Sequence, residues 1–308
     1  MESSNLTIGI PAYNCEKDLP KLLESLSNIK NIKYEIIIIN DGSKDNTLAV
    51  CKKYASKNRN IKIYSQKNKG VSHARNEIIK RASGEWITFI DSDDNIVVNV
   101  FEEFINKALE NHEKSLHIAI QNINKYNRIS KKNEKLPLLI ENEIINSVCM
   151  KLYKRHAIEN KKLTFNEKYD IGEDLLFNIG YYSGENELQI YNSGYYIINK
   201  RNGSLTRKKS AQLTTLKNVR LECIDLLRRK KLLTKKCDKA LEYIGIKNMI
   251  SSIKKQEIRL GEGLTRFRIN TQHYILYNSI RATAICNAWR ILCICKNKLN
   301  YFRKGTPK

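Results

Sequence analysis

Apolar and polar residues alternate along the first hundred residues in blocks that predict strands and helices in turn. Leu6 to Ile10 is a short β-rich run, and Asp18 to Ser27 places four leucines on one helical face. Tyr34 to Ile39 is an almost continuous β-branched run, as expected for a strand buried on both faces. The same alternation predicts further helices and strands at Asn46–Tyr54, Ile61–Tyr64, Val71–Ala82 and Trp86–Ile90. Four strand-to-helix repeats indicate an α/β fold with a parallel sheet and right-handed crossovers.

The rest of the chain has a weaker pattern and becomes more basic after about residue 208. Weaker signals predict a helix, a strand and a polar loop at Phe101–Glu110, Leu116–Ile123 and Arg128–Lys135. Beyond Ser210 the pattern is mostly helical, with Leu216–Lys231 and Lys235–Ser252 the clearest segments. We therefore expect a first domain at residues 1–208, divided into halves 1–95 and 96–208, and a basic helical C-terminal region at 209–308.

Polar residues follow each of the four predicted strands. In open α/β sheets, ligands bind at the carboxyl ends of the strands, so these residues are expected to gather at one edge of the sheet. They are Pro11-Ala12-Tyr13-Asn14, Asn40-Asp41-Gly42-Ser43, Asn68-Lys69-Gly70 and Asp91-Ser92-Asp93-Asp94.

Asp91, Asp93 and Asp94 come directly after an apolar strand. Clustered carboxylate oxygens suit Mg²⁺ or Mn²⁺, which often bridge protein carboxylates to substrate phosphates. An isolated Asp-x-Asp pair more commonly caps the next helix or occupies a solvated turn. Asp41 leaves a similar choice between a turn residue and an acceptor for a base or a ribose. Spacing alone leaves both alternatives open.

Five short motifs occur in order along the first 95 residues, each at a predicted strand end or helix start. They are Ile10-Pro11-Ala12-Tyr13-Asn14, Asn40-Asp41-Gly42-Ser43, Asn68-Lys69-Gly70-Val71-Ser72, Ala82-Ser83-Gly84-Glu85 and Asp91-Ser92-Asp93-Asp94. This ordered set resembles glycosyltransferase family 2, which has the GT-A fold, a Rossmann-like nucleotide-binding sheet with helices on both faces. The resemblance implies an enzyme that takes a sugar from a nucleotide diphosphate donor.

The resemblance also implies a role for each matched residue. Asp93 would be the principal contact of a Mn²⁺ or Mg²⁺ ion, which neutralises the diphosphate as it leaves. Asp41 would contact the base, and Asp91 and Ser92 would face the ribose. The other implied nucleotide-sugar-binding residues are Pro11, Ala12, Tyr13, Asn14, Glu16, Asn68, Gly70 and Arg75.

A second segment, Tyr169–Phe177, extends the resemblance because it is similar to the Glu-Asp element of the family. Asp174 would then be the general base that removes a proton from an acceptor hydroxyl, with inversion at the anomeric carbon. The alternative is an acidic pair favoured at a helix N-terminus. Further on, Lys200 or Arg201 would touch the diphosphate, or would lie in a solvated turn. The Gln-x-x-Arg-Trp element of processive relatives is absent, which favours one addition per acceptor.

Composition excludes several other classes of protein. The 308-residue chain is 41% hydrophobic with 4 prolines, which is typical of a globular protein. Its 8 cysteines form no Cys-x-x-Cys pair and its 5 histidines are scattered, so a zinc site is not expected and a reduced, intracellular chain is. Neither a signal-peptide pattern nor an apolar stretch of about 18–20 residues occurs. We expect a cytoplasmic protein, with peripheral binding at the inner face of the plasma membrane as an open alternative.

The net charge of +23 is concentrated in the last third of the chain. Residues 201–308 hold 26 of the 55 Lys and Arg residues but only 6 of the 32 Asp and Glu residues. This asymmetry indicates an anionic partner, either nucleic acid or an anionic membrane surface. Ala282–Cys295 is apolar and flanked by cations, which fits an interfacial helix or, equally, a core-packed terminal helix. Nucleic acid is the weaker alternative because no recognised binding motif accompanies the charge.

The sequence therefore favours inverting, metal-dependent, non-processive transfer from a nucleotide diphosphate sugar to a hydroxyl acceptor. A UDP-sugar is the donor most common among relatives, and a glycan or lipid-linked precursor of capsule, exopolysaccharide or lipopolysaccharide is the expected acceptor. One rival is a basic nucleic-acid-binding protein with a degenerate nucleotide pocket, against which Asp41, Asp93 and Asp174 argue. Another is a nucleotidyltransferase, which would need a glycine-rich, lysine-containing phosphate loop near the N-terminus.

Overall fold

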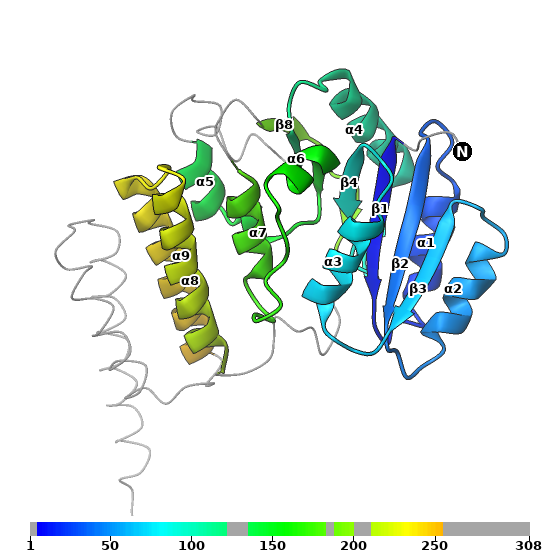
Figure 1. Cartoon of the computed structure of the whole chain (residues 1–308), viewed down its shortest axis with the longest axis horizontal. Helices are drawn as coiled ribbons and strands as arrows, with labels where there is room; N and C mark the ends of the chain where they lie inside the picture. The colour runs from blue at the N-terminus through cyan, green and yellow to red at the C-terminus, as the bar shows by residue number, and fades with distance from the viewer. Residues whose placement is uncertain (1–4, 122–134, 183–187, 200–210, 255–308) are drawn as a thin grey trace, which may run out of the picture. The chain divides into compact units, whose positions relative to one another are not determined.

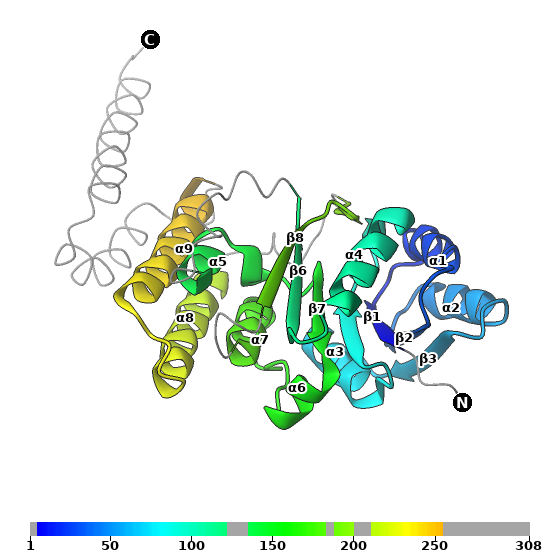
Figure 2. The same cartoon turned by 90° about the horizontal axis from the view of Figure 1, so that it is seen from above.

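A seven-stranded sheet forms the centre of the fold in this computed structural model, which describes residues 5–121, 135–182, 188–199 and 211–254 (Figure 1). Its strands are β1 (Leu6–Ala12), β2 (Tyr34–Asp41), β3 (Ile61–Gln66), β4 (Trp86–Phe89), β6 (Leu116–Ile120), β7 (Lys151–Lys154) and β8 (Leu188–Asn192). They lie in the order β3-β2-β1-β4-β7-β6-β8. The first four are parallel, whereas β7 is antiparallel to β4 and β6, so the sheet is mixed (Figure 2). A separate antiparallel pair joins β5 (Asn95–Ile96) to β9 (Tyr196–Ile197).

Helices cover both faces of the sheet, and alternate residues of β2 pack against different helices. Ile36 lies in one buried cluster with the leucines of α1 (Leu19–Ser27), whereas Ile37 lies in another with Ile78 of α3 (Val71–Arg81). Successive side chains of a strand point to opposite faces, so β2 is buried on both, as its unbroken β-branched run predicts. The other helices are α2 (Thr47–Ala55), α4 (Val98–Glu110), α5 (Lys135–Glu141), the 3₁₀ helix η2 (Ile144–Asn146), α6 (Arg155–Asn160), α7 (Glu173–Tyr181), α8 (Ala211–Arg229) and α9 (Lys235–Lys254).

Residues Met1–Asn248 form one compact unit, and Met249–Lys308 form a second. The first unit runs past the boundary expected at residue 208, because α8 packs against α7 (Figure 1). Among the described residues, no helix combines the length and the apolar character needed to cross a membrane. The expectations for Lys200, Arg201 and Ala282–Cys295, and for all but the last residue of the polar loop, lie outside the described residues.

The helices and strands expected in the first hundred residues are all confirmed, with ends that differ by at most two residues. The parallel arrangement of their four strands is confirmed as well. The later helices and the strand expected at residues 116–123 are also present, but nothing in the periodicity indicated the antiparallel β7 or the short β5 and β9. Strands of two to four residues are too short to show a periodicity of their own.

Hydrogen bonds hold the turn before β4 at the end of the sheet where the parallel strands begin. Glu35, near the start of β2, accepts hydrogen bonds from the backbone N–H and the hydroxyl of Ser83 at 2.6 and 2.7 Å. It also accepts one from the Thr7 hydroxyl at 2.7 Å and one from the Lys62 ammonium at 2.7 Å. A Cβ on Gly84 would lie 2.5 Å from the backbone nitrogen of Thr7, so only glycine fits. The fourth motif of the resemblance therefore has a structural role, away from the candidate site.

Candidate active site

The loops that follow β1 and β2 are tied to each other at the carboxyl ends of these strands. The Asn14 backbone N–H donates to the Ser43 hydroxyl at 3.0 Å, and the Lys44 N–H donates to the Asn14 side-chain oxygen at 2.8 Å. The Asn46 N–H donates to the carboxylate of Glu16 at 2.8 Å. Asn14 has a φ of 47°, a left-handed conformation that Asn adopts more readily than most residues. Asn14 and Glu16, both expected at the donor, thus shape these loops through contacts within the chain.

Asp41 holds the backbone at the start of α3. One of its carboxylate oxygens accepts hydrogen bonds from the Lys69 N–H and the Gln66 amide, and the other accepts from the Gly70 N–H, all at 2.8 Å. Gly70 has a φ of 90°, and a Cβ added there would meet no heavy atom within 4 Å. The neighbouring Asn68 is exposed. Asp41 therefore presents a stretch of backbone to open space at the edge where the strands end.

The acidic loop after β4 is held in place by residues about one hundred positions later. The Asp91 backbone N–H donates to the Tyr196 hydroxyl at 3.1 Å. Asn199 donates its backbone N–H to the carboxylate of Asp94 at 2.9 Å and its side-chain amide to the carbonyl of Asp93 at 2.7 Å. The loop is therefore shaped by the strand pair β5–β9, which brings Tyr196 and Asn199 beside it.

The carboxylates of this loop crowd one another in a half-buried environment. Burial raises the pKa of Asp93 to about 6, and the negative charges of Asp94 and Asp91 add to the increase. Burial also raises the pKa of Asp94, although hydrogen bonds from Asn199 and Tyr196 oppose this. A cation bound beside these carboxylates would lower their pKa values, because a nearby positive charge favours the ionised form.

These residues fit a hard divalent cation that also has ligands from outside the protein. Carboxylate oxygens are the ligands that Mg²⁺ and Mn²⁺ prefer. In the part of the chain that the structure describes, no three His, Cys, Asp or Glu side chains are grouped so that they could hold an ion. An ion at Asp93 would thus depend on water and substrate phosphates for most of its ligands, as Mg²⁺ commonly does.

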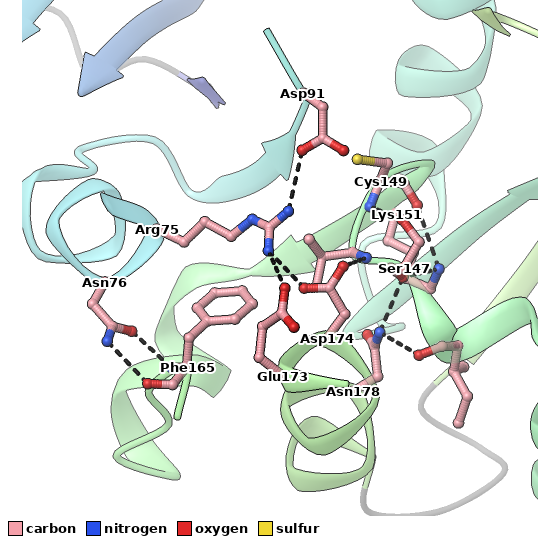
Figure 3. A network of polar contacts seen from close by, with 12 residues as sticks. Arg75, Asn76, Asp91, Ser147, Cys149, Lys151, Phe165, Glu173, Asp174 and Asn178 are labelled. Carbon is pink, nitrogen blue, oxygen red and sulfur yellow. Dashed lines mark hydrogen bonds and ion pairs between the residues drawn. The ribbon is translucent and has the colours of Figure 1, made fainter. Parts of the chain in front are cut away.

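Arg75 connects the acidic loop to the Glu-Asp element (Figure 3). One terminal guanidinium nitrogen lies 3.1 Å from Asp91, and the other terminal nitrogen lies 2.7 Å from Asp174 and 3.1 Å from Glu173. The guanidinium carbon also lies 5.4 Å from the centre of the Phe165 ring, a cation–π contact. Only 5% of the Arg75 side chain is exposed. Arg75 of α3 thus joins Asp91, at the end of β4, to Glu173 and Asp174 of α7. The resemblance implies that Asp91 acts on the donor side of the reaction and Asp174 on the acceptor side.

Asp174 stands at the start of α7, beside the buried end of Arg75. Gly172 turns the chain into α7 with a φ of 86°, and a Cβ there would lie 2.8 Å from Val219 of α8. The second oxygen of Asp174 accepts a hydrogen bond from the Val148 N–H at 3.1 Å. Burial raises the pKa of Asp174 to about 7; Arg75 opposes this increase, and the negative charge of Glu173 adds to it. Burial thus holds the pKa of this carboxyl above its ordinary value, toward the range in which a general base is most effective.

The structure brings only part of the predicted set into direct contact. Arg75, Asp91 and Asp174 meet in one network of ion pairs, whereas Asn14, Glu16 and Asp41 make their contacts in the loops after β1 and β2. Arg75 was expected near the donor phosphates, and its contacts here are to carboxylates. The remaining predicted residues lie at the same strand ends: Pro11 and Ala12 buried, Tyr13 44% exposed, and Ser92 9% exposed.

Several residues of the site were not expected from the sequence. Glu173 shares Arg75 with Asp174, the backbone of Val148 binds Asp174, and Tyr196 and Asn199 hold the acidic loop. Backbone donors and residues of short, distant strands leave no periodic signal. Glu173 did have a signal, since it adjoins Asp174 in the Glu-Asp element.

An α/β sheet with acidic residues at its strand ends and a buried carboxyl of raised pKa beside them is typical of an enzyme site that binds nucleotides. The model of glycosyl transferase family 2 matches residues 7–184, so the chain belongs to this family. The match includes the acidic loop and the Glu-Asp element and ends before α8.

Named relatives match between about a third and about two thirds of the chain. An uncharacterized glycosyltransferase, EpsJ of Bacillus subtilis, is 29% identical over 217 residues, which are 65% of this chain and 62% of EpsJ. YibD of Escherichia coli, another uncharacterized glycosyltransferase, is 40% identical over 111 residues, 36% of this chain and 32% of YibD. Poly(ribitol-phosphate) beta-N-acetylglucosaminyltransferase TarS of Staphylococcus aureus is 28% identical over 205 residues, 64% of this chain and 36% of TarS. The matched part is thus less than two thirds of each of these relatives.

Solved structures confirm the fold. The chain is similar to S. aureus TarS 1–349 in complex with UDP-GlcNAc, with a TM-score of 0.63, 22% identity, and coverage of 78% of this chain and 71% of the other. It is also similar to mannosyltransferase PcManGT from Pyrobaculum calidifontis in complex with GDP-Man and Mn²⁺, with a TM-score of 0.59, 12% identity, and coverage of 98% and 84%. The predicted GT-A fold is therefore confirmed, with the mixed sheet described above.

Proposed function

We propose that this protein transfers a sugar from a nucleotide diphosphate donor to a hydroxyl of an acceptor, with inversion at the anomeric carbon. The observation that carries the proposal is the Arg75 network. It joins Asp91 of the acidic loop to Asp174 of the Glu-Asp element through contacts of 3.1 and 2.7 Å. This link supports the proposal, because such a transfer needs carboxylates for the donor and for the acceptor close to each other.

On the acceptor side, Asp174 would act as the general base. Its ionised carboxylate takes the proton of the acceptor hydroxyl while the oxygen forms a bond to the anomeric carbon, and the bond from that carbon to the diphosphate oxygen breaks. Attack opposite to the leaving group inverts the configuration. Arg75 and the Val148 N–H favour the ionised form of Asp174, and burial opposes it, which keeps its pKa near neutrality.

On the donor side, Asp93 and its neighbours would hold a Mn²⁺ or Mg²⁺ ion together with the donor diphosphate. When bound, the ion supplies positive charge that stabilises the leaving diphosphate. The raised pKa of Asp93 supports this assignment, because the negative charges of Asp94 and Asp91 contribute to it and a cation would oppose them. The backbone of Gly70, held by Asp41, and the loop residues Tyr13 and Asn14 would bind the nucleotide.

We propose a UDP-sugar as the donor and a surface-glycan precursor as the acceptor. The support for the donor is the likeness to TarS, which was crystallised with UDP-GlcNAc. The support for the acceptor is that TarS, a sequence relative, is named for transfer to poly(ribitol-phosphate). The missing Gln-x-x-Arg-Trp element favours one addition per acceptor rather than processive synthesis.

A lipid-linked acceptor at the inner face of the plasma membrane would account for the basic residues 201–308. We expect the full chain to sediment with anionic liposomes and to lose this binding when residues 262–308 are deleted. Neutral liposomes are the control. If the full chain does not bind anionic liposomes, the membrane proposal fails, while the transferase proposal is unaffected.

A panel of nucleotide sugars tests the transferase proposal directly. We expect release of nucleoside diphosphate from one of them, dependent on Mn²⁺ or Mg²⁺ and abolished by a chelator. Asp93→Ala should remove the activity. Asp170 is an exposed aspartate in the segment Tyr169–Phe177, and Asp170→Ala should retain the activity. Full activity of Asp93→Ala would overturn the metal assignment, and no release from any donor would overturn the proposed function.

A further inference from the structure

Lys151 is a buried lysine near the Glu-Asp element. It begins β7, and only 1% of it is exposed. Its ammonium donates hydrogen bonds to the backbone carbonyls of Ile144 at 2.8 Å, Ser147 at 2.6 Å and Cys149 at 3.3 Å (Figure 3). All three N–H donors thus have an acceptor, which is the condition under which a protein tolerates a buried charge.

The carbonyls that bind Lys151 belong to one segment, Ile144–Cys149, which includes the 3₁₀ helix η2. Asn178 of α7 also holds this segment, since its side-chain amide donates to the carbonyls of Ile145 at 2.8 Å and Ser147 at 3.0 Å. A short irregular segment is thereby fixed by two buried side chains. Burying a lysine costs several kcal/mol before its hydrogen bonds are counted, and here the carbonyls of Ile144, Ser147 and Cys149 offset that cost.

The same segment carries the backbone donor that faces the proposed base. The Val148 N–H lies 3.1 Å from the second carboxylate oxygen of Asp174. A hydrogen bond to an ionised carboxylate favours the ionised form, and so does a nearby positive charge. The charged and titratable groups that face Asp174 are Arg75 of α3, Asp91 after β4, Glu173 of α7, Cys149 before β7, and Lys151 and Tyr153 of β7. Arg75 and Lys151 are the cations in this set.

We propose that Lys151 is a positioning residue for the base: it holds Ile144–Cys149 so that the Val148 N–H points at Asp174, and its charge favours the carboxylate. This inference rests on the proposed function, in which Asp174 receives the acceptor proton. Burial lowers the pKa of Lys151 to about 8, so the side chain is still charged in the neutral range where the base ionises.

Lys151→Met tests the proposal, with Lys154→Met as a matched control on the same strand. Lys154 is partly exposed and binds the carbonyl of His112, away from the base. The measurement is the pH dependence of kcat/KM for sugar transfer. We expect the ionisation limb of Lys151→Met to move to higher pH by about one unit, because the base loses both a cation and a fixed N–H donor. The limb of Lys154→Met should stay with that of the unaltered protein.

Asn178→Leu keeps the test informative if Lys151→Met does not fold, as judged by circular dichroism. It loosens the same segment without removing a charge, so its limb should move in the same direction by less. A lower rate at every pH with an unmoved limb would show that Lys151 is only structural and would overturn the proposal.

A second readout separates this inference from the proposed function. The pKa of the Asp174 carboxyl can be titrated by ¹³C NMR, with Asp174→Asn used to assign its signal, and no turnover is needed. We expect a higher pKa in Lys151→Met than in Lys154→Met. An unchanged pKa would overturn the inference alone, whereas full transfer by Asp174→Asn would overturn the assignment of the base.

Discussion

Glu35 and Asp174 are both buried carboxylates, but they lie at opposite ends of the central strands and differ in their acidity. Burial alone would raise the pKa of Glu35, yet the hydrogen bonds from Lys62, Ser83 and Thr7 lower it to about 2. Burial raises the pKa of Asp174 to about 7 in spite of Arg75. The same chemical group is thus strongly acidic at one edge of the sheet and titrates near neutrality at the other.

The difference comes from the number of favourable partners relative to the burial of the charge. Glu35 has a lysine to itself and several neutral donors. Asp174 shares the guanidinium of Arg75 with Glu173 and Asp91, so Arg75 is divided among three negative charges. A fully satisfied carboxylate stabilises the fold, whereas an incompletely compensated one can exchange a proton in the neutral range. We therefore expect substitution of Glu35 to lower the stability of the fold, and substitution of Asp174 to lower the rate of transfer.

The largest expected effect is that of Asp174→Asn on transfer. Loss of a general base should lower kcat by about 10²- to 10⁴-fold, because the amide cannot accept the acceptor proton. The variant should remain folded, as measured by circular dichroism and urea unfolding. Asp170→Asn, an exposed change four residues earlier, is the control and should keep its activity. If Asp174→Asn kept more than about a tenth of the activity, Asp174 would not be the general base.

Glu35→Gln should have the opposite profile. We expect the free energy of unfolding to fall by about 2–3 kcal/mol, because the amide group would face the Lys62 ammonium without a charge to compensate it. Activity per folded molecule should stay unchanged well below the melting temperature. Glu85→Gln, in the same turn but with its side chain 57% exposed, should cost less than about 0.5 kcal/mol. Urea unfolding of both variants measures the difference, and equal stabilities would contradict the role given to Glu35.

The two carboxylates should also respond to pH with opposite signs. The pKa of Glu35 is lower in the folded protein than its ordinary 4.5, so its stabilising contribution is lost as pH falls from about 4.5 through about 2. The pKa of Asp174 is higher in the folded protein than its ordinary 3.8, so its contribution to stability declines as pH rises from about 3.8 through about 7. Unfolding of the unaltered protein, Glu35→Gln and Asp174→Asn across this range would show each contribution as a difference. Parallel pH profiles for all three would contradict both assignments.

The pH dependence of kcat/KM gives a separate test of the ionisation of Asp174. Below about pH 7, kcat/KM should fall about tenfold per pH unit, because protonated Asp174 cannot act as a base. The Glu35→Gln variant should show the same limb, since Glu35 lies at the other edge. A limb displaced to pH 4 in the unaltered protein would mean that Asp174 is as acidic as an ordinary aspartate.

Much of the fold could be predicted from the sequence, because amphipathic helices and buried strands have a periodicity of their own. The four leucines of α1 and the β-branched run of β2 specify both elements and the faces that they bury. The antiparallel β7 could not be predicted, because its pairing depends on partners more than thirty residues away in the chain. Its four residues also match no long pattern.

The candidate site could be predicted as a set of residues but not as a set of contacts. The acidic loop and the Glu-Asp element were recognisable as motifs, and the structure joins them. The sequence pattern did not show that Arg75 would be buried between them, because an arginine near a helix start is usually solvated. Asp41 and Glu16 show the converse, since both occur in recognisable motifs yet make loop contacts within the chain.

Glu222 of α8 is a third carboxylate to compare with Glu35 and Asp174. It is partly exposed, and it binds the segment that precedes Asp174 without touching Asp174 itself. It accepts hydrogen bonds from the Tyr169 hydroxyl and the Asn166 amide, which lie in the segment leading to Asp174. We expect Glu222→Ala to lower the free energy of unfolding by about 1–2 kcal/mol, because two hydrogen bonds to a charged acceptor are lost. Asp225→Ala on the same helix, which breaks only an exposed pair with Arg229, should cost less than about 0.5 kcal/mol.

Because Glu222 touches the segment before Asp174 rather than the base, Glu222→Ala should change kcat only a few-fold, and the pH limb of kcat/KM should not move. A limb that did move would show that α8 also sets the acidity of Asp174, and the site would then extend beyond the residues that match the family.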